Sequence, residues 1–247
     1  MTERPLVGVL GGMGPLATAD FYQKVIELTP ATRDQDHVRL AIWADPTTPD
    51  RTTALLRGGP SPVSGLIRGL LSLEACGAQV IAIPCNTAHA YLAELRAASS
   101  TPILDMIDLA VARTRETNPA VTRIGVLATR GTHASGMYDR AAAARGIELV
   151  HLRDDQQSDY VDTAIAMVKS GRDFDVAESL IAKAARVLSD DGAEAVIAGC
   201  TEIPPAARGA ARVLPVVDAT KALAHRVVTW GLAQPNSTPC ASGSSVE

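Results

Sequence analysis

Three short segments of the chain recur in the same order about 115 positions further on. The matched positions are Gly8 with Gly125, Gly14 with Gly131, Gly77 with Gly192, Cys85 with Cys200, Pro102 with Pro215, and Asp105 with Asp218. The offset decreases only from 117 to 113 positions along the chain, so the two halves have nearly the same internal spacing. A repeat of this kind predicts two similar structural units.

Each half contains continuous apolar runs of strand length, separated by segments in which apolar residues have helical spacing. The apolar runs span residues 6–10, 38–44, 78–84, 123–129, 147–152 and 193–199, and the helical segments span residues 18–28, 64–76, 91–98, 158–170 and 176–190. Apolar runs that are continuous and not alternating are typical of parallel strands covered on both faces. The sequence therefore predicts an α/β fold of open, doubly wound type, built as two similar lobes with parallel sheets.

The repeat also predicts how the chain is divided. We expect residues 1–112 to form the first lobe and residues 113–213 the second, with residues 214–233 packing back on the first lobe. Residues 234–247 are rich in small polar side chains and are predicted to be disordered, which would make Cys240 a bystander.

Charge and the amino terminus narrow the class of protein. The 247-residue chain carries 23 Lys and Arg against 27 Asp and Glu, a formal charge of -4, and it has no basic block, so we expect no nucleic-acid partner. It shows neither a secretory signal nor a span of about 20 apolar residues at its start, which predicts a cytoplasmic protein with no membrane partner. The four cysteines lack metal-site spacing and are expected to be thiols, with no bound metal.

Cys85 and Cys200 are the strongest candidates for chemistry, because each follows an apolar run at an equivalent place in the repeat. Ligands of open α/β sheets bind at the carboxyl ends of the strands, so two facing lobes would bring these cysteines together across a cleft. Main-chain N–H groups at the following helix starts would stabilise the thiolates. One thiolate could then remove a proton from one face of a carbon while the opposite thiol supplies a proton to the other face, which inverts a stereocentre.

Side chains beside the strand-end loops would bind the substrate of such a reaction. The candidates for hydrogen bonds to a carboxylate and to the charge that develops on it are Asn86, Thr87, Thr132 and Thr201. A buried cysteine is also common as a small core residue, which is our expectation for Cys76. For Cys85 and Cys200 the repeat favours the chemical role.

The loop after the first strand suggests a rival hypothesis. Residues 12–17 match the looser form of the dinucleotide fingerprint, G-x-G-x-x-A. The expected acidic residue about 20 positions later is poorly placed, since Asp34 and Asp36 come too early and Asp45 too late. We therefore interpret the glycines as allowing the main chain to approach a small anionic ligand.

Three further residues each have an ordinary structural interpretation, and two of them also have a functional one. His89 lies one helical turn after Cys85 and could tune that thiol or merely fill a packing position. Arg51 lies in a proline-started turn and could bind a carboxylate or be a solvated loop residue. Lys169 precedes Gly171, so it could be no more than part of a helix end.

The sequence resembles the aspartate/glutamate racemase family, most closely the cofactor-independent aspartate racemases. The motifs that carry the resemblance are GVLGGMGPLAT, PDRT, PCNTAHA, VLATRGT, VKSG and AGCTEIP, and they cover residues 7 to about 220. The resemblance implies two Rossmann-like lobes related by a pseudo-two-fold axis, a site in the cleft between them, a homodimer, a small amino-acid substrate, and no pyridoxal phosphate or other cofactor.

The same resemblance assigns residues to roles. It makes Cys85 and Cys200 the acid/base thiols and makes Arg51 and Lys169 the cations that hold the carboxylates of aspartate. The other residues implied to line the substrate pocket are Met13, Asn86, Thr87, Thr132 and Thr201. Glu202 and His89 are implied to lie behind the residues that touch the substrate.

One departure affects the substrate. Asp45 and Thr47 stand before the PDRT motif where similar family members have an Asn-Pro-Gln-like stretch, and a carboxylate close to Arg51 would weaken its hold on an acidic side chain. We therefore expect aspartate first, then glutamate or a less acidic amino acid. Other two-thiol isomerases of the superfamily, such as hydantoin racemases and maleate isomerases, remain alternatives, as does a non-catalytic nucleotide- or metabolite-binding protein. The presence of both cysteines argues against a single-cysteine decarboxylase.

Overall fold

The apolar runs of the sequence form the strands of two separate parallel sheets in the computed structural model, which describes residues 4–233. The strands are β1 (Leu6–Gly11), β2 (Arg39–Ala44), β3 (Val80–Ala82), β4 (Arg123–Leu127), β5 (Glu148–Val150), β6 (Ala195–Ala198) and β7 (Val216–Asp218). The predicted α/β fold with two parallel sheets is thus confirmed. The predicted tail at residues 234–247, with Cys240, lies outside the described residues.

The two sheets have equivalent strand orders. The first is β2-β1-β3 and the second is β5-β4-β6-β7. The first sheet has a single parallel bridge, Ile81 with Ile103, in the place that β7 occupies in the second. Gly8 and Gly125 also occupy equivalent positions, and a Cβ at either one would lie 2.6 Å from a side chain, Ile81 or Leu188. Glycine is required there because a helix or strand side chain packs directly on the main chain.

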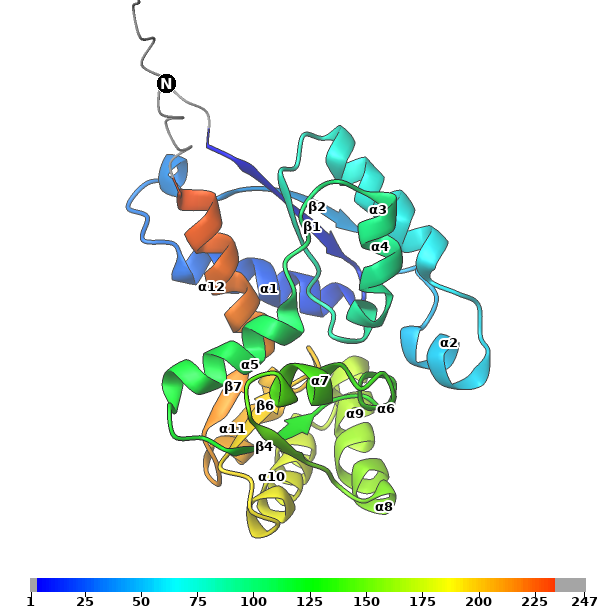
Figure 1. Cartoon of the computed structure of the whole chain (residues 1–247), viewed down its shortest axis with the longest axis vertical. Coiled ribbons are helices and arrows are strands. Elements are labelled where there is room, and N and C mark those ends of the chain that lie inside the picture. The colour runs from blue at the N-terminus through cyan, green and yellow to red at the C-terminus, as the bar shows by residue number, and fades with distance from the viewer. Residues whose placement is uncertain (1–3, 234–247) are drawn as a thin grey trace, which may run out of the picture.

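Helices cover both sheets, as Figure 1 shows. They are α1 (Pro15–Leu28), α2 (Arg51–Arg57), α3 (Val63–Ala75), α4 (Leu92–Ala98), α5 (Met106–Thr117), α6 (Arg130–Ala134), α7 (Met137–Ala143), α8 (Asp154–Gln156), α9 (Thr163–Ser170), α10 (Phe174–Asp190), α11 (Ala207–Ala211) and α12 (Ala219–Leu232). Short 3-10 turns lie at Asp34–Asp36, Thr87–Tyr91 and Pro204–Ala206, and the π-helical segment Gln157–Asp162 leads into α9.

The helices form where apolar spacing and capping residues coincide. In α10 the buried residues include Ala177, Ile181, Ala184 and Leu188, spaced three or four apart along one face. The repeated aspartates begin the equivalent helices α5 and α12: Asp105 accepts main-chain N–H bonds of 3.1 Å at the start of α5, and Asp218 accepts one of 3.0 Å at the start of α12.

These two capped helices cross between the halves of the chain. α5 packs on α7, β6 and β7 of the second half, α12 packs on α1 and β1 of the first half, and the two helices contact each other. The expected boundary at residues 112/113 therefore falls inside α5. The expected return of residues 214–233 to the first lobe also needs correction, because β7 pairs with β6 in the second sheet and only α12 crosses over.

The largest buried cluster holds the halves together. It includes Phe21 and Val25 of α1, Val111 of α5, and Leu223 and Val227 of α12. Smaller clusters fill the far sides of the two sheets. Because the largest cluster draws side chains from both halves, burial of apolar surface fixes how the sheets face each other.

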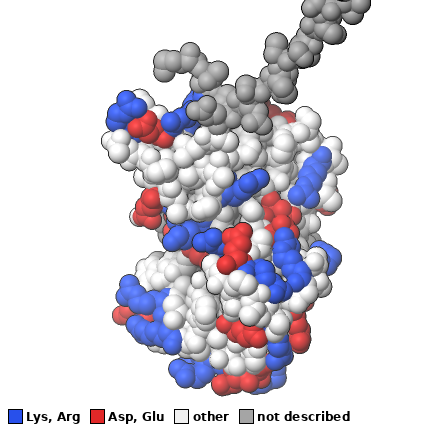
Figure 2. Space-filling model, turned by 60° about the vertical axis from the view of Figure 1, so that its left-hand side comes forward, with Lys and Arg blue, Asp and Glu red and all other residues white. Residues whose placement is uncertain are grey.

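Charged side chains of both signs are interspersed over the face seen in Figure 2, with no large area of one sign. Within residues 4–233 no helix combines the length and apolar character needed to span a membrane. Cys76, expected in the core, is instead exposed at the end of α3, because the apolar face of that helix is filled by residues such as Leu66, Leu70 and Leu73.

Candidate active site

The repeated cysteines converge on one cavity between the lobes. Cys85 follows β3, Cys200 follows β6, both are buried, and both line a small cavity of about 20 Å³. Its lining residues are Met13, Asp50, Arg51, Thr52, Cys85, Asn86, Thr87, Thr129, Lys169, Cys200, Thr201 and Glu202. Most of the predicted site residues are thus brought together, as expected when the carboxyl ends of two parallel sheets face each other.

Three threonines form a hydroxyl cluster at this cavity. The Oγ1 atom of Thr87 lies 3.0 Å from those of Thr129 and Thr132, which lie 3.1 Å from each other. Thr132 does not itself line the cavity but contacts it through the other two hydroxyls. Thr129, which accepts the N–H of Thr132 at the start of α6, was missed by sequence reasoning, although its place at the end of an apolar run was the available signal.

Cys200 is held in its protonated form. Its Sγ donates to Oε2 of Glu202 over 2.9 Å, and Thr201 donates to the same oxygen over 3.2 Å. Burial, followed by the charge of Glu202, raises the pKa of the Cys200 thiol well above its ordinary value. The expectation of a thiolate stabilised by a helix start is therefore wrong for Cys200, because a carboxylate faces the sulfur and only a short 3-10 turn follows.

His89 supports the Cys85 loop through the main chain. Its Nε2 accepts the N–H of Met106 over 3.1 Å, so in the neutral ring Nδ1 carries the hydrogen and donates to the carbonyl of Cys85 over 2.9 Å. Burial lowers the pKa of His89, which keeps the ring neutral. His89 therefore ties the Cys85 peptide to the start of α5 and makes no contact with the sulfur that would tune it directly.

Asn86 presents free hydrogen-bond donors to the cavity. Its Oδ1 accepts the hydroxyl of Tyr138 over 2.6 Å, and its Nδ2 is buried with no partner among the described residues. Burial raises the pKa of Tyr138, which keeps its hydroxyl protonated as the donor. An amide held in this orientation can donate to a ligand carboxylate. Nothing in the sequence pattern pointed to Tyr138, which lies 52 positions from its partner.

The two predicted cations both line the cavity, in different settings. Arg51 donates to the carbonyls of Thr48, Pro49 and Met13 over 3.1 to 3.3 Å, while its buried Nε has no partner among residues 4–233. This leaves Arg51 fixed in place with N–H capacity for a ligand. Lys169 approaches from α9 on the other lobe.

The carboxylate beside these cations is Asp50, not Asp45. Asp45 accepts from Thr47 and pairs with Arg68 at 3.4 Å, and the bonds from Thr47 hold its pKa low. The sequence expectation that Asp45 would weaken Arg51 is therefore wrong. Asp50 lines the cavity and caps α2; although burial acts to raise its pKa, hydrogen bonds at that cap and the charges of Arg51 and Lys169 lower it.

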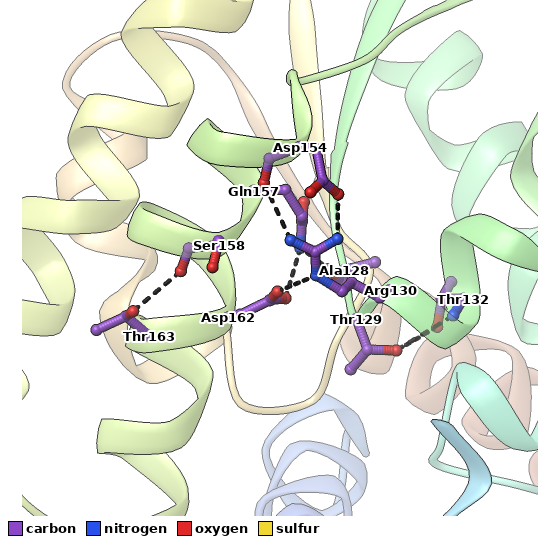
Figure 3. Close-up of polar contacts among 9 residues, drawn as sticks. All are labelled: Ala128, Thr129, Arg130, Thr132, Asp154, Gln157, Ser158, Asp162 and Thr163. Atoms are coloured by element: carbon purple, nitrogen blue, oxygen red, sulfur yellow. Dashed lines mark hydrogen bonds and ion pairs between the residues drawn. The ribbon is translucent and has the colours of Figure 1, made fainter. Parts of the chain in front are cut away.

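A polar network ties the helix of Lys169 to the end of β4 (Figure 3). Arg130 donates from Nε to Asp162 over 2.6 Å, and the amide of Gln157 bridges Asp162 and the carbonyl of Ala128 over 2.8 and 2.9 Å. These bonds fix the π-helical segment, which continues without a break into α9. π-Helical turns of this kind are frequent at functional sites, and here the turn sets the direction of the helix that carries Lys169.

The glycine-rich loop has a packing explanation. Gly12 has φ +89°, and a Cβ there would lie 2.4 Å from the main-chain nitrogen of Asp45. Its N–H donates to Thr18 over 2.8 Å, so it does not point to a ligand. Met13 follows and lines the cavity. No group of three or more His, Cys, Asp or Glu side chains in residues 4–233 is arranged to hold a metal ion.

Comparisons with known proteins identify the family of the chain. The family model for Asp/Glu/Hydantoin racemase matches residues 10–227. A broad-specificity amino-acid racemase of Bacillus subtilis is 29% identical over 92% of this chain and 99% of its own length. The solved structure of an aspartate racemase from Picrophilus torridus is 31% identical, covers 92% of this chain and 94% of its own, and superposes with a TM-score of 0.81. A glutamate racemase of Corynebacterium kroppenstedtii is 34% identical over 59% of this chain and 51% of its own. This protein belongs to the Asp/Glu/hydantoin racemase family.

Proposed function

We propose that the protein is a cofactor-independent amino-acid racemase in which Cys85 and Cys200 are the two acid/base groups. The observation that carries the proposal is that two buried cysteines, at equivalent places in an internal repeat, line one cavity from opposite lobes. A single buried cysteine would have an ordinary packing explanation, whereas a pair that lines one cavity supports a two-base inversion.

The proposed reaction moves one proton off the α-carbon and another onto its opposite face. In one direction Cys85, as thiolate, takes the α-proton and becomes a thiol, while Cys200 gives up its proton and becomes a thiolate. The reverse reaction exchanges these roles. The electron pair left by the α-proton is delocalised onto the substrate carboxylate, where Asn86 Nδ2 and the hydroxyl of Thr87 would donate hydrogen bonds. Burial, together with the charge and hydrogen bond of Glu202, raises the pKa of the Cys200 thiol, so that this thiol rests protonated and can act as the acid.

Aspartate is the substrate that we propose first. Arg51 and Lys169 would supply positive charge for its two carboxylates, and Glu202 would face its ammonium group. Glutamate and less acidic amino acids come next, in line with the names of the relatives. The proposal also includes a cytoplasmic location, where thiols stay reduced, and a homodimer, as the family resemblance implies.

The test is proton NMR of L-aspartate in heavy water with the purified, reduced protein, followed by a chiral assay of the product. We expect loss of the α-proton signal together with formation of D-aspartate. Cys85→Ala and Cys200→Ala should each abolish racemisation, a loss of at least about 10²-fold for one acid/base group. Cys76→Ala is the matched control, because that thiol is exposed outside the cavity and its loss should change nothing.

A second panel extends the test to other amino acids. If aspartate is untouched but another amino acid exchanges its α-proton, the two-thiol mechanism stands and the substrate changes. Absence of exchange for every amino acid in the panel would refute the racemase proposal. Full activity of either cysteine variant in the cavity would refute the mechanism.

A further inference from the structure

We propose that the site also accepts amino acids with long apolar side chains, which extend from the thiol pair into a second, larger cavity. This inference rests on the proposed racemase function and names a further class of substrate for it. The larger cavity has a volume of about 750 Å³ and lies between the start of α1, the end of α9 and the start of α10.

The two cavities are neighbours with a common border. Five residues line both of them: Met13, Arg51, Lys169, Thr201 and Glu202. The thiol cavity of about 20 Å³ has room for about one water molecule, so it cannot hold a whole amino acid. A substrate whose α-carbon lies between the thiols must therefore extend its side chain across this border into the larger space.

The larger cavity is apolar beyond the border. Its walls include Leu16, Ala17, Ala19, Val168, Phe174 and Pro205. Leu16 is 69% exposed and Phe174 is 44% exposed, so the fold itself leaves these large apolar side chains uncovered. Contact with an apolar ligand would remove their surface from water, which is the favourable term in binding at such a cavity.

The position of the charges separates short acidic substrates from long apolar ones. Arg51 and Lys169 lie at the border, where the carboxylate of a short side chain such as that of aspartate would stop. Asp20, which also lines the larger cavity, is paired at 2.5 Å with Lys24, a lysine that it shares with Asp218 at 2.8 Å. A longer apolar side chain passes the cations and meets walls that are mainly aliphatic and aromatic, with Asp20 and Gln23 as the polar members.

The experiment measures kcat/KM for L-alanine, L-2-aminobutyrate, L-norvaline and L-norleucine, which differ by one methylene each. Each buried methylene should raise kcat/KM about fourfold, or about 60-fold from alanine to norleucine. Ala19→Trp places an indole in the larger cavity from an exposed position of α1, and Ala97→Trp on α4 is the matched control at an exposed site away from both cavities.

We expect Ala19→Trp to reduce norleucine turnover at least tenfold more than alanine turnover, and Ala97→Trp to reduce neither. A flat length series, or an equal loss for all substrates in Ala19→Trp, would overturn the inference, because the cavity would then be only an entrance. Calorimetric affinities for the same series provide a second measurement. If affinity rises with length and Ala19→Trp removes the rise, but no amino acid is racemised, the side-chain cavity stands while the racemase proposal fails.

Discussion

Replacing His89 with leucine would remove two main-chain hydrogen bonds at once. The change leaves the Cys85 carbonyl without its donor at 2.9 Å and the Met106 N–H without its acceptor at 3.1 Å. Each buried unsatisfied group costs about 1–3 kcal/mol, so the free energy of unfolding should fall by about 2–6 kcal/mol. For a chain of this size that corresponds to a decrease in Tm of about 4–24 °C. His89→Gln can keep one of the two hydrogen bonds, so its free energy of unfolding should lie between those of His89→Leu and the wild type.

The stability that His89→Leu loses should depend on pH, and the lowered pKa of the buried His89 ring determines the direction of this dependence. Because burial lowers the pKa of His89, the unfolded chain binds a proton more readily than the folded one below about pH 6.5. The stability contributed by the neutral ring is therefore present above about pH 6.5 and is lost as the pH falls, by at most about 1.4 kcal/mol per pH unit. The leucine variant lacks this titration, so its deficit relative to the wild type should be largest above pH 7 and should shrink at lower pH.

Urea unfolding at pH 8 and pH 5.5 measures both effects. His225→Leu serves as the control, since that histidine is exposed on α12. A His89→Leu deficit no larger than that of the control would refute the assignment of the two hydrogen bonds. A deficit that widens as the pH falls would refute the neutral ring.

Three further outcomes follow from the structure. Burial lowers the pKa of His133 to about 4, so this ring should contribute about 3 kcal/mol to the loss of wild-type stability between pH 6.5 and pH 4. His133→Leu should remove that part of the slope in urea unfolding, and an unchanged slope would contradict the assignment. Arg130→Met should raise KM for aspartate about tenfold and change kcat less than threefold, because the helix that carries Lys169 loses its anchor. Arg130→Lys should restore part of the lost affinity. A KM for Arg130→Met equal to that of the wild type would count against this role. Gly12→Ala should lower the free energy of unfolding by more than about 2 kcal/mol. Gly58→Ala is the control and should lower it by about 1–2 kcal/mol, because Gly58 also has a positive φ but has open space around it. Equal losses in the two variants would show that the contact with Asp45 is unimportant.

The convergence of the cysteines was predictable because it depends on features that sequence records directly. Continuous apolar runs identify parallel strands, and the repeat places Cys85 and Cys200 at the same end of equivalent strands. The two cysteines then share a cavity by the geometry of the fold alone. The return of the last helix to the first half was also expected from the sequence, and α12 does pack on α1. The packing of α5 on the second half was not expected, because it is decided by tertiary contacts.

Contacts between individual side chains were the least predictable part of the site. The expected thiolate at Cys200 failed because the direction in which Glu202 points is set by the loop, not by its spacing of two residues. Asp45 was expected beside Arg51 because the two are close in sequence, yet Arg68 from α3 pairs with it. Tyr138 orients Asn86 from the opposite lobe and carries no sequence signal of that role.

The crossing of the last helix has a consequence for folding during synthesis. α12 packs on α1, so the burial of Phe21 and Val25 in the cluster that joins the halves is completed only after residues 219–232 have been synthesised. Contacts between segments about 200 residues apart form slowly, because a long loop must close before they are gained. The packing that joins the two halves is therefore completed only after α12 has docked.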